Sequence, residues 1–216
     1  QVSDLHNKEF GKNQNRLVEL TKKINPDIIV VTGDLIDSRR TNIDIAVNYV
    51  SQVVEIAPTY YIPGNHESRI DEYDKLEKML SKEGIKVLSN DSENIKINNQ
   101  EVALLGMEDI SFMNSKNRKK AFSSILSNLK HESKNNLTIL LSHRPELIDI
   151  YAKQNIDLVF TGHAHGGQIR LPFIGGLLSP GQGILPKYTS GIYEKDNTKM
   201  IVSRGLGNSI FPLRIF

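Results

Sequence analysis

The 216-residue chain contains no cysteine and no tryptophan. Without cysteine it has no disulfide framework, no thiol nucleophile and no cysteine-ligated zinc site, which fits a reducing compartment. Its apolar runs are all shorter than the roughly 20 residues of a transmembrane helix. The formal net charge is only +2, so no basic stripe for nucleic acid is expected. A chain of this length and composition predicts one globular domain, residues 1–216.

Both ends of the chain lie within apolar sequence. Gln1–Ser3 has the character of the end of a strand, and residues 211–216 lack a polar tail. No signal peptide is recognisable. We therefore expect a domain trimmed at both ends, located in the cytoplasm or peripherally at a membrane, with an N-terminal anchor missing.

Apolar strands alternate with amphipathic helices along most of the chain. The apolar spacing predicts helices over residues 13–24, 42–56, 72–83, 119–129 and 145–154. Continuous apolar runs predict buried strands at 27–32, 58–62, 137–141 and 156–160. Shorter strands are expected at 87–88, 94–97, 101–106, 189–193 and 200–203, with a Gly/Pro/Leu-rich loop after Gly167. This order predicts an α/β fold with a mixed sheet or two stacked sheets.

Residue types that bind metals follow the predicted strands at five places. They are Asp4 and His6, Asp34, Asn65 and His66, His143, and His163 and His165. Five of the six histidines lie at such strand exits, and only His131 does not. In open α/β sheets, sites form where the carboxyl ends of strands meet. Residues two apart at a strand end are expected to point the same way, which applies to Asp4 with His6 and to His163 with His165.

These side chains supply only nitrogen and oxygen ligands, a set that suits manganese, iron or zinc. Seven such groups exceed the needs of one ion, and one carboxylate can bridge two. Two metals about 3.5–4 Å apart clamp a phosphoryl oxygen and acidify a water. Taken singly, a residue such as His143 or Asn65 is better explained as a hydrogen-bonded core histidine or a turn former. Taken together they indicate a binuclear site, with Glu67 expected to support a ligand or begin a helix.

Five motifs carry a resemblance to a known family. In order they are Asp4–Leu5–His6, Gly33–Asp34, Gly64–Asn65–His66–Glu67, Ser142–His143 and Gly162–His163–Ala164–His165. As a set they resemble the motifs of the calcineurin-like metallophosphoesterase superfamily, across essentially the whole chain. The resemblance implies a four-layer α/β/β/α sandwich of two mixed sheets. Residues 4–12 and 165–172 look like the bacterial YkuE/YaeI-type membrane-associated phosphodiesterase branch, whose members often carry an N-terminal anchor.

The resemblance also implies roles for individual residues. Asp4, His6 and His165 would hold one metal, Asn65, His143 and His163 the other, and Asp34 would bridge them. His66 would donate a proton to the leaving oxygen or steady the transition state. The cofactors would be two divalent ions, manganese first, with iron, zinc or cobalt as alternatives. The implied reaction is hydrolysis of a phosphodiester, or a phosphomonoester, by a metal-bridging hydroxide.

The substrate is less closely defined. Arg170, Arg204 and Arg40 are candidate phosphate contacts. Residues 171–178 form either a loop folded against the core or an exposed apolar lip that touches a membrane surface; the lip would fit a lipid-linked or membrane-proximal substrate. The rival interpretations are a UDP-2,3-diacylglucosamine-type pyrophosphatase and a non-catalytic metal-binding scaffold. No oligomeric state is predicted.

Overall fold

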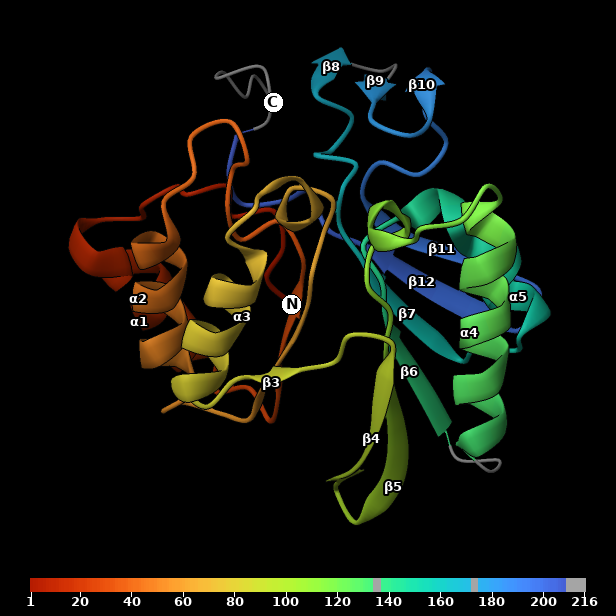
Figure 1. The fold of residues 1–216 in the computed structure, drawn as a ribbon, viewed down its shortest axis with the longest axis horizontal. Coiled ribbons are helices and arrows are strands. Elements are labelled where there is room, and N and C mark those ends of the chain that lie inside the picture. Colours follow the sequence, from red (N-terminus) through yellow and green to blue (C-terminus); the bar gives the residue numbers. More distant parts are fainter. Residues whose placement is uncertain (134–136, 172–174, 209–216) are drawn as a thin grey trace.

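The computed structural model describes residues 1–133, 137–171 and 175–208. It has four layers, with helices outside and two β-sheets inside (Figure 1). The mixed α/β fold expected from the sequence is confirmed. The two sheets lie face to face, and each carries its own helices on its outer side (Figure 1).

The first half of the chain builds a three-stranded parallel sheet and its helices. The strands are β1 (Ile29–Thr32), β2 (Thr59–Ile62) and β3 (Lys86–Val87), in the order β1-β2-β3. Val2 adds a parallel bridge to Val31. The outer face is covered by α1 (Asn15–Ile24), α2 (Ile43–Val53) and α3 (Tyr73–Lys82) (Figure 1). The expected helices and strands of this half are therefore present, each within a few residues of its predicted bounds.

The second half builds a six-stranded mixed sheet in the order β11-β12-β7-β6-β5-β4. Its strands are β4 (Asp91–Ile97), β5 (Gln100–Gly106), β6 (Leu137–Leu141), β7 (Leu158–Thr161), β11 (Gly191–Lys195) and β12 (Thr198–Val202). The central pairs are parallel and the edge strands β4 and β11 are antiparallel. Helices α4 (Arg118–Glu132) and α5 (Ile148–Lys153) cover the outer face (Figure 1).

Alternate residues of the inner strands face different apolar clusters. In β1, Val31 packs with the helices of the first half, whereas Val30 packs between the two sheets. In β2, Tyr61 and Tyr60 divide in the same way. A strand buried on both faces needs apolar residues at every position, which explains its continuous apolar run in the sequence. The fully buried Leu104 of β5 belongs to the cluster between the sheets.

The prediction of a loop after Gly167 is wrong for the described residues. The segment instead forms a small three-stranded antiparallel sheet of β8 (Ile169–Leu171), β9 (Gly175–Ser179) and β10 (Gly183–Ile184), at the top of Figure 1. The backbones of Gly167 and Gly176 approach so closely that a side-chain carbon on either would clash with the other. Glycine that signals a loop in sequence serves here for close packing. Residues 172–174 lie outside the described part of the chain.

The packing between the sheets can be tested at Leu104. Replacing this buried side chain with alanine leaves a cavity between two rigid sheets, so Leu104→Ala should lower the free energy of unfolding by about 2–5 kcal/mol in urea denaturation. Leu137→Ala is the matched control, because Leu137 is 50% exposed, and should cost about 1 kcal/mol. Equal losses for the two variants would contradict this description of the core.

Candidate metal centre

The candidate metal residues lie together where strands of both sheets end. Asp34 follows β1, Asn65 follows β2, His143 follows β6 and His163 follows β7. The N-terminal residues join them because the chain there runs alongside β1. The N–H of Asp4 donates to the carbonyl of Gly33 at 3.0 Å, and the N–H of His6 donates to the carbonyl of Asp34 at 3.1 Å. The site is therefore built from segments far apart in the sequence.

Five candidate ligands have a left-handed backbone, with φ of +53° at Asp4, +48° at His6, +53° at Asp34, +64° at His163 and +50° at His165. These residues therefore lie on turns and not on an extended strand; Asp4 and His6 nevertheless converge, whereas His163 and His165 belong to different groups. Each such conformation costs about 1–3 kcal/mol in a residue with a side chain, and such strain concentrates at functional sites. The turns, rather than strand alternation, direct these side chains.

A first group brings together Asp4, His6, Asp34 and His165. One ligand atom from each lies within 4.8 Å of all the others, and all four residues are buried. The Nε2 atoms of His6 and His165 are 3.1 Å apart. Nε2 of His165 lies 3.4 Å from Oδ1 of Asp4, and Nε2 of His6 lies 3.6 Å from Oδ2 of Asp34. Two carboxylates and two imidazoles thus converge on one small volume.

A second group contains Asp34 again, with His143 and His163. Nδ1 of His143 donates to the carbonyl of Thr32 at 2.7 Å, because a carbonyl can only accept. Its Nε2 therefore faces Oδ2 of Asp34 at 3.3 Å and Nδ1 of His163 at 3.2 Å. The carboxylate oxygen of Asp34 can only accept, so a proton or a cation between it and Nε2 of His143 would stabilise this contact.

The electrostatics show the same demand for positive charge. Burial lowers the pKa of His143, but the carboxylates, Asp34 foremost, outweigh it and raise that pKa to about 10. Burial alone would raise the pKa of Asp34, yet His143 and His6 hold it well below its usual range. Burial and His143 both lower the pKa of His163. The group thus holds an ionised carboxylate and a neutral imidazole beside a cationic one, an arrangement in which a metal ion can replace the proton.

Asn65 is the candidate ligand with an unsatisfied oxygen. It is 3% exposed, and its Oδ1 has no hydrogen-bond partner among the described residues. An unpaired buried acceptor costs about 1–3 kcal/mol, which a bound cation would recover. Asn65 lines a cavity of about 190 Å³ whose other described walls are Asp34, Arg39, His66, Arg69, His163, His165, Gln168 and Pro180.

Glu67 connects the loops that follow β1 and β2. Its Oε2 accepts the N–H groups of Asp34 at 2.9 Å and Gly64 at 2.8 Å, and its Oε1 accepts that of Ile36 at 3.3 Å. The carboxyl is fully buried, and burial together with Asp34 raises its pKa to about 7. Glu67 therefore positions the backbone of Asp34, and it also opens the short 3₁₀ helix Glu67–Arg69.

His66 stands beside the first group, with its ring edge-on to that of His6 at a centroid distance of 4.5 Å. The N–H of Ser38 donates to its Nδ1 at 3.0 Å, so the proton of the neutral ring sits on Nε2. Nδ1 also lies 3.4 Å from Oδ1 of Asp37. The N–H of His66 itself donates to Oδ1 of Asp34 at 2.8 Å. His66 can thus present an N–H donor next to the convergent carboxylates.

Arg39 and Arg69 are the arginines among the described residues that line the cavity. Arg204 is exposed and is not among those residues, and the side chain of Arg170 lies outside the described part of the chain. Arg39 and Arg69 are both close to motif residues in the sequence, but nothing in the local pattern separates them from other surface arginines.

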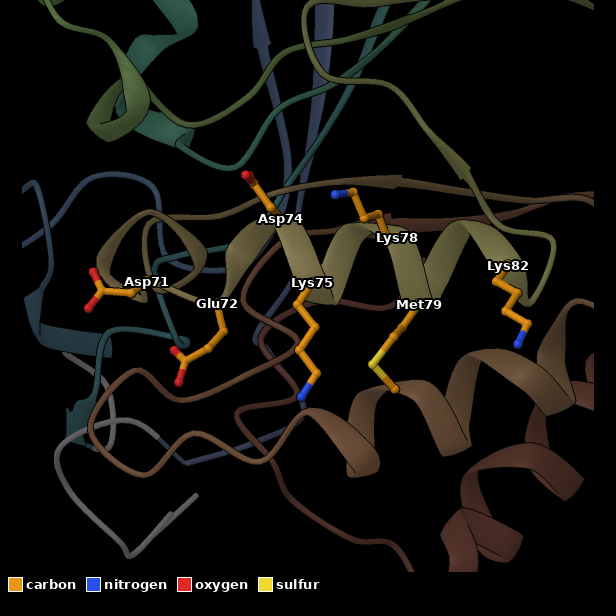
Figure 2. Close-up of a pocket in the computed structure, with 7 residues that line it drawn as sticks. All are labelled: Asp71, Glu72, Asp74, Lys75, Lys78, Met79 and Lys82. Carbon is orange, nitrogen blue, oxygen red and sulfur yellow. The ribbon is translucent and has the colours of Figure 1, made fainter.

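A larger hollow lies elsewhere and contains none of the residues described above. It has a volume of about 650 Å³ and is lined by Asp71, Glu72, Asp74, Lys75, Lys78, Met79 and Lys82. Figure 2 shows these side chains along α3 and the turn before it, with Lys75 and Met79 directed toward the neighbouring helix. Alternating acids and lysines are usual on the exposed face of a helix. The candidate metal residues line the smaller cavity and not this one.

Residues 1–167 match the family described as calcineurin-like phosphoesterase. The chain belongs to this family, a class of metal-dependent phosphoric ester hydrolases. It is 28% identical to the uncharacterized metallophosphoesterase YkoQ of Bacillus subtilis, over 99% of this chain and 77% of YkoQ. It is 27% identical to phosphodiesterase YaeI of Escherichia coli, over 88% of this chain and 66% of YaeI. A dimetal phosphatase from Danio rerio shares the fold, with a TM-score of 0.54, 14% identity, and coverage of 94% of this chain and 86% of that one.

Glu67 offers a test of how the site is positioned. Glu67→Gln replaces one acceptor oxygen with an NH₂ group that would face a backbone N–H, so the turn at Asp34 should loosen. The affinity for Mn²⁺, measured by calorimetric titration, should fall about 10–100-fold. Glu55→Gln, at an exposed position after α2, should bind as the wild type does. An unchanged affinity in Glu67→Gln would exclude this positioning role.

Proposed function

We propose that this chain hydrolyses phosphodiester bonds with a pair of divalent cations. The observation that carries the proposal is that Asp34 belongs to both buried groups, as a bridging carboxylate would. Asp4, His6 and His165 would complete one site. His143, His163 and the unsatisfied oxygen of Asn65 would complete the other.

When bound, the two cations would activate a water as the nucleophile and clamp the phosphoryl oxygens. His66 would donate a hydrogen bond from its Nε2–H to the departing oxygen and steady the transition state, because the N–H of Ser38 already occupies its Nδ1. The nitrogen and oxygen ligand set favours manganese, with iron, zinc or cobalt as alternatives. The similarity to YaeI, which is named a phosphodiesterase, supports a diester in preference to a monoester.

The reaction should be lost when either Asp34, which belongs to both groups, or His143, which belongs to one, is replaced. Asp34→Asn weakens both sites and His143→Ala removes one ligand, so each should lower hydrolysis of bis-p-nitrophenyl phosphate more than about 100-fold in buffer of defined Mn²⁺ content. Chelation should inactivate the wild type, and added Mn²⁺ should restore it. His131→Ala, on the exposed side of α4, is the control. Turnover that survives both ligand changes would refute the proposal, and metal binding without any turnover would favour a scaffold.

We also propose that the small sheet contacts a membrane surface. Of the lip expected at residues 171–178, positions 172–174 lie outside the described part of the chain and Leu178 is 37% exposed. Ile184 and Leu185, at 79% and 65% exposure, would extend the lip. The lip lies on the segment that includes Gln168 and Pro180 of the cavity wall. Residues 166–193 contain no aspartate or glutamate, so the segment would not repel anionic lipid. Among the described helices, none is long and apolar enough to cross a membrane.

Flotation with phosphatidylglycerol vesicles tests the lip. Replacing Leu178, Ile184 and Leu185 together by serine removes about 1–2 kcal/mol of apolar transfer energy per side chain, so binding should fall roughly 100-fold or more. Ile192→Ser is the control, because Ile192 is 70% exposed but lies on β11 of the six-stranded sheet. Equal flotation of the wild type and the triple variant would rule out this surface.

A further inference from the structure

Asp109 is a buried carboxylate that belongs to neither group of candidate metal residues. It lies on the loop after β5, and its side chain is fully buried. Both of its oxygens accept hydrogen bonds from the guanidinium of Arg144, from Nε to Oδ2 at 2.6 Å and from Nη2 to Oδ1 at 3.0 Å. Nη2 also donates to Oγ of Ser111 at 3.1 Å. A paired contact between a planar guanidinium and a carboxylate is short and fixed in orientation.

This ion pair joins two loops that carry candidate ligands. Arg144 directly follows His143 in the sequence. On the other side, the backbone N–H of Asp109 donates to the carbonyl of Pro63 at 3.2 Å, and Pro63 lies on the same loop as Asn65. Asn65 follows β2 of the three-stranded sheet, whereas His143 follows β6 of the six-stranded sheet. Asp109 therefore connects the two sheets at the loops of these two candidate ligands.

The loop that carries His143 is also held from α5. The fully buried hydroxyl of Tyr151 donates to the carbonyl of Arg144 at 2.6 Å, because a carbonyl can only accept. The same hydroxyl accepts a hydrogen bond from Oγ of Ser142 at 2.8 Å. The loop is therefore fixed within its own half of the fold, and its contact with Asp109 sets its separation from the loop after β2.

The charges of this pair depend on each other. Burial would raise the pKa of Asp109, but the contact with the guanidinium of Arg144 outweighs burial and lowers that pKa. Removing the charge of one partner in a buried ion pair leaves the other charge uncompensated. A neutral side chain at position 109 should therefore release Arg144 from its position.

The first group is anchored by contacts that do not involve this pair. The N–H groups of Asp4 and His6 donate to the carbonyls of Gly33 and Asp34, and the N–H of Gly207 donates to the carbonyl of Asp4 at 2.6 Å. Loss of the ion pair should therefore displace members of the second group and leave the first group in place.

We propose that Asp109 and Arg144 are positioning residues for the second of the two cations and not for the first, because they hold the loops of Asn65 and His143 at a fixed separation. This inference rests on the proposed function, in which those two residues share an ion. Asp109 and Arg144 are not among the described residues that line the cavity, so they act through the ligands and not on the substrate.

Calorimetric titration with Mn²⁺ tests the inference. The wild type should bind two ions. Asp109→Asn keeps the size of the side chain but removes its charge, so one ion should bind about tenfold more weakly or worse while the other keeps its affinity. At two equivalents of Mn²⁺, electron paramagnetic resonance should show a spin-coupled pair in the wild type and uncoupled ions in the variant. On a His143→Ala background, where the second site is already damaged, Asp109→Asn should have little further effect.

Asp157→Asn is the matched control. Oδ2 of Asp157 also joins two segments of the chain, because it accepts the N–H and the hydroxyl of Thr138 at 2.8 and 2.7 Å. These residues lie at the starts of β6 and β7, at the opposite end of the strands from the site. The control should lower stability and leave both Mn²⁺ affinities unchanged. Arg144→Lys keeps the charge without the fork and should weaken the same ion as Asp109→Asn by about threefold.

A smaller fall in Asp109→Asn, equal falls for both ions, or a full loss on the His143→Ala background would overturn the inference and leave the proposed pair of cations standing. If Asp109→Asn does not fold, Arg144→Lys decides, and a fall smaller than expected there overturns the inference. Fewer than two ions in the wild type would contradict the proposed pair, and this inference with it. If the wild type binds two ions but hydrolyses no ester, the proposed activity fails, while the same titrations still decide the inference.

Discussion

The site depends on a single buried carboxylate, that of Asp34. Its Oδ2 lies 3.6 Å from Nε2 of His6 in the first buried group and 3.3 Å from Nε2 of His143 in the second. A carboxylate held in the interior at 1% exposure is tolerated only with compensating charge and hydrogen bonds. The N–H of His66 supplies a hydrogen bond to its Oδ1, while Glu67 holds its backbone N–H. The loops after β1 and β2 are arranged around this requirement.

The buried charge of Asp34 also contributes to the perturbed pKa values of His143 and Glu67. Asp34 contributes to the raised pKa of His143, because a nearby negative charge favours the imidazolium. It also adds to burial in raising the pKa of Glu67 to about 7, because a like charge disfavours a second carboxylate. Both pKa values are raised, and Asp34 contributes to each shift. A cation at this position would relieve both shifts, which agrees with the membership of Asp34 in both buried groups.

The layers and the order of the site residues could be predicted from the sequence, because these features are local. The run at β1 is apolar at every position since Val30 and Val31 face different clusters. The conformation of Asp4 and His6 could not be predicted in this way. It is fixed by hydrogen bonds to Gly33 and Asp34, nearly thirty positions along the chain, and no periodicity carries such a contact. The same holds for Arg69, which reaches the cavity only through the tertiary arrangement.

Each of the two buried groups draws its members from both halves of the sandwich. Asp4, His6 and Asp34 come from the layer of β1, whereas His143, His163 and His165 follow β6 and β7 of the other sheet. Any cation held by either group would therefore bind residues of both sheets at once and hold the two sheets together. Metal affinity in this protein would then report on how well the two sheets are aligned, and changes in the apolar layer between them would be felt at the site without touching it.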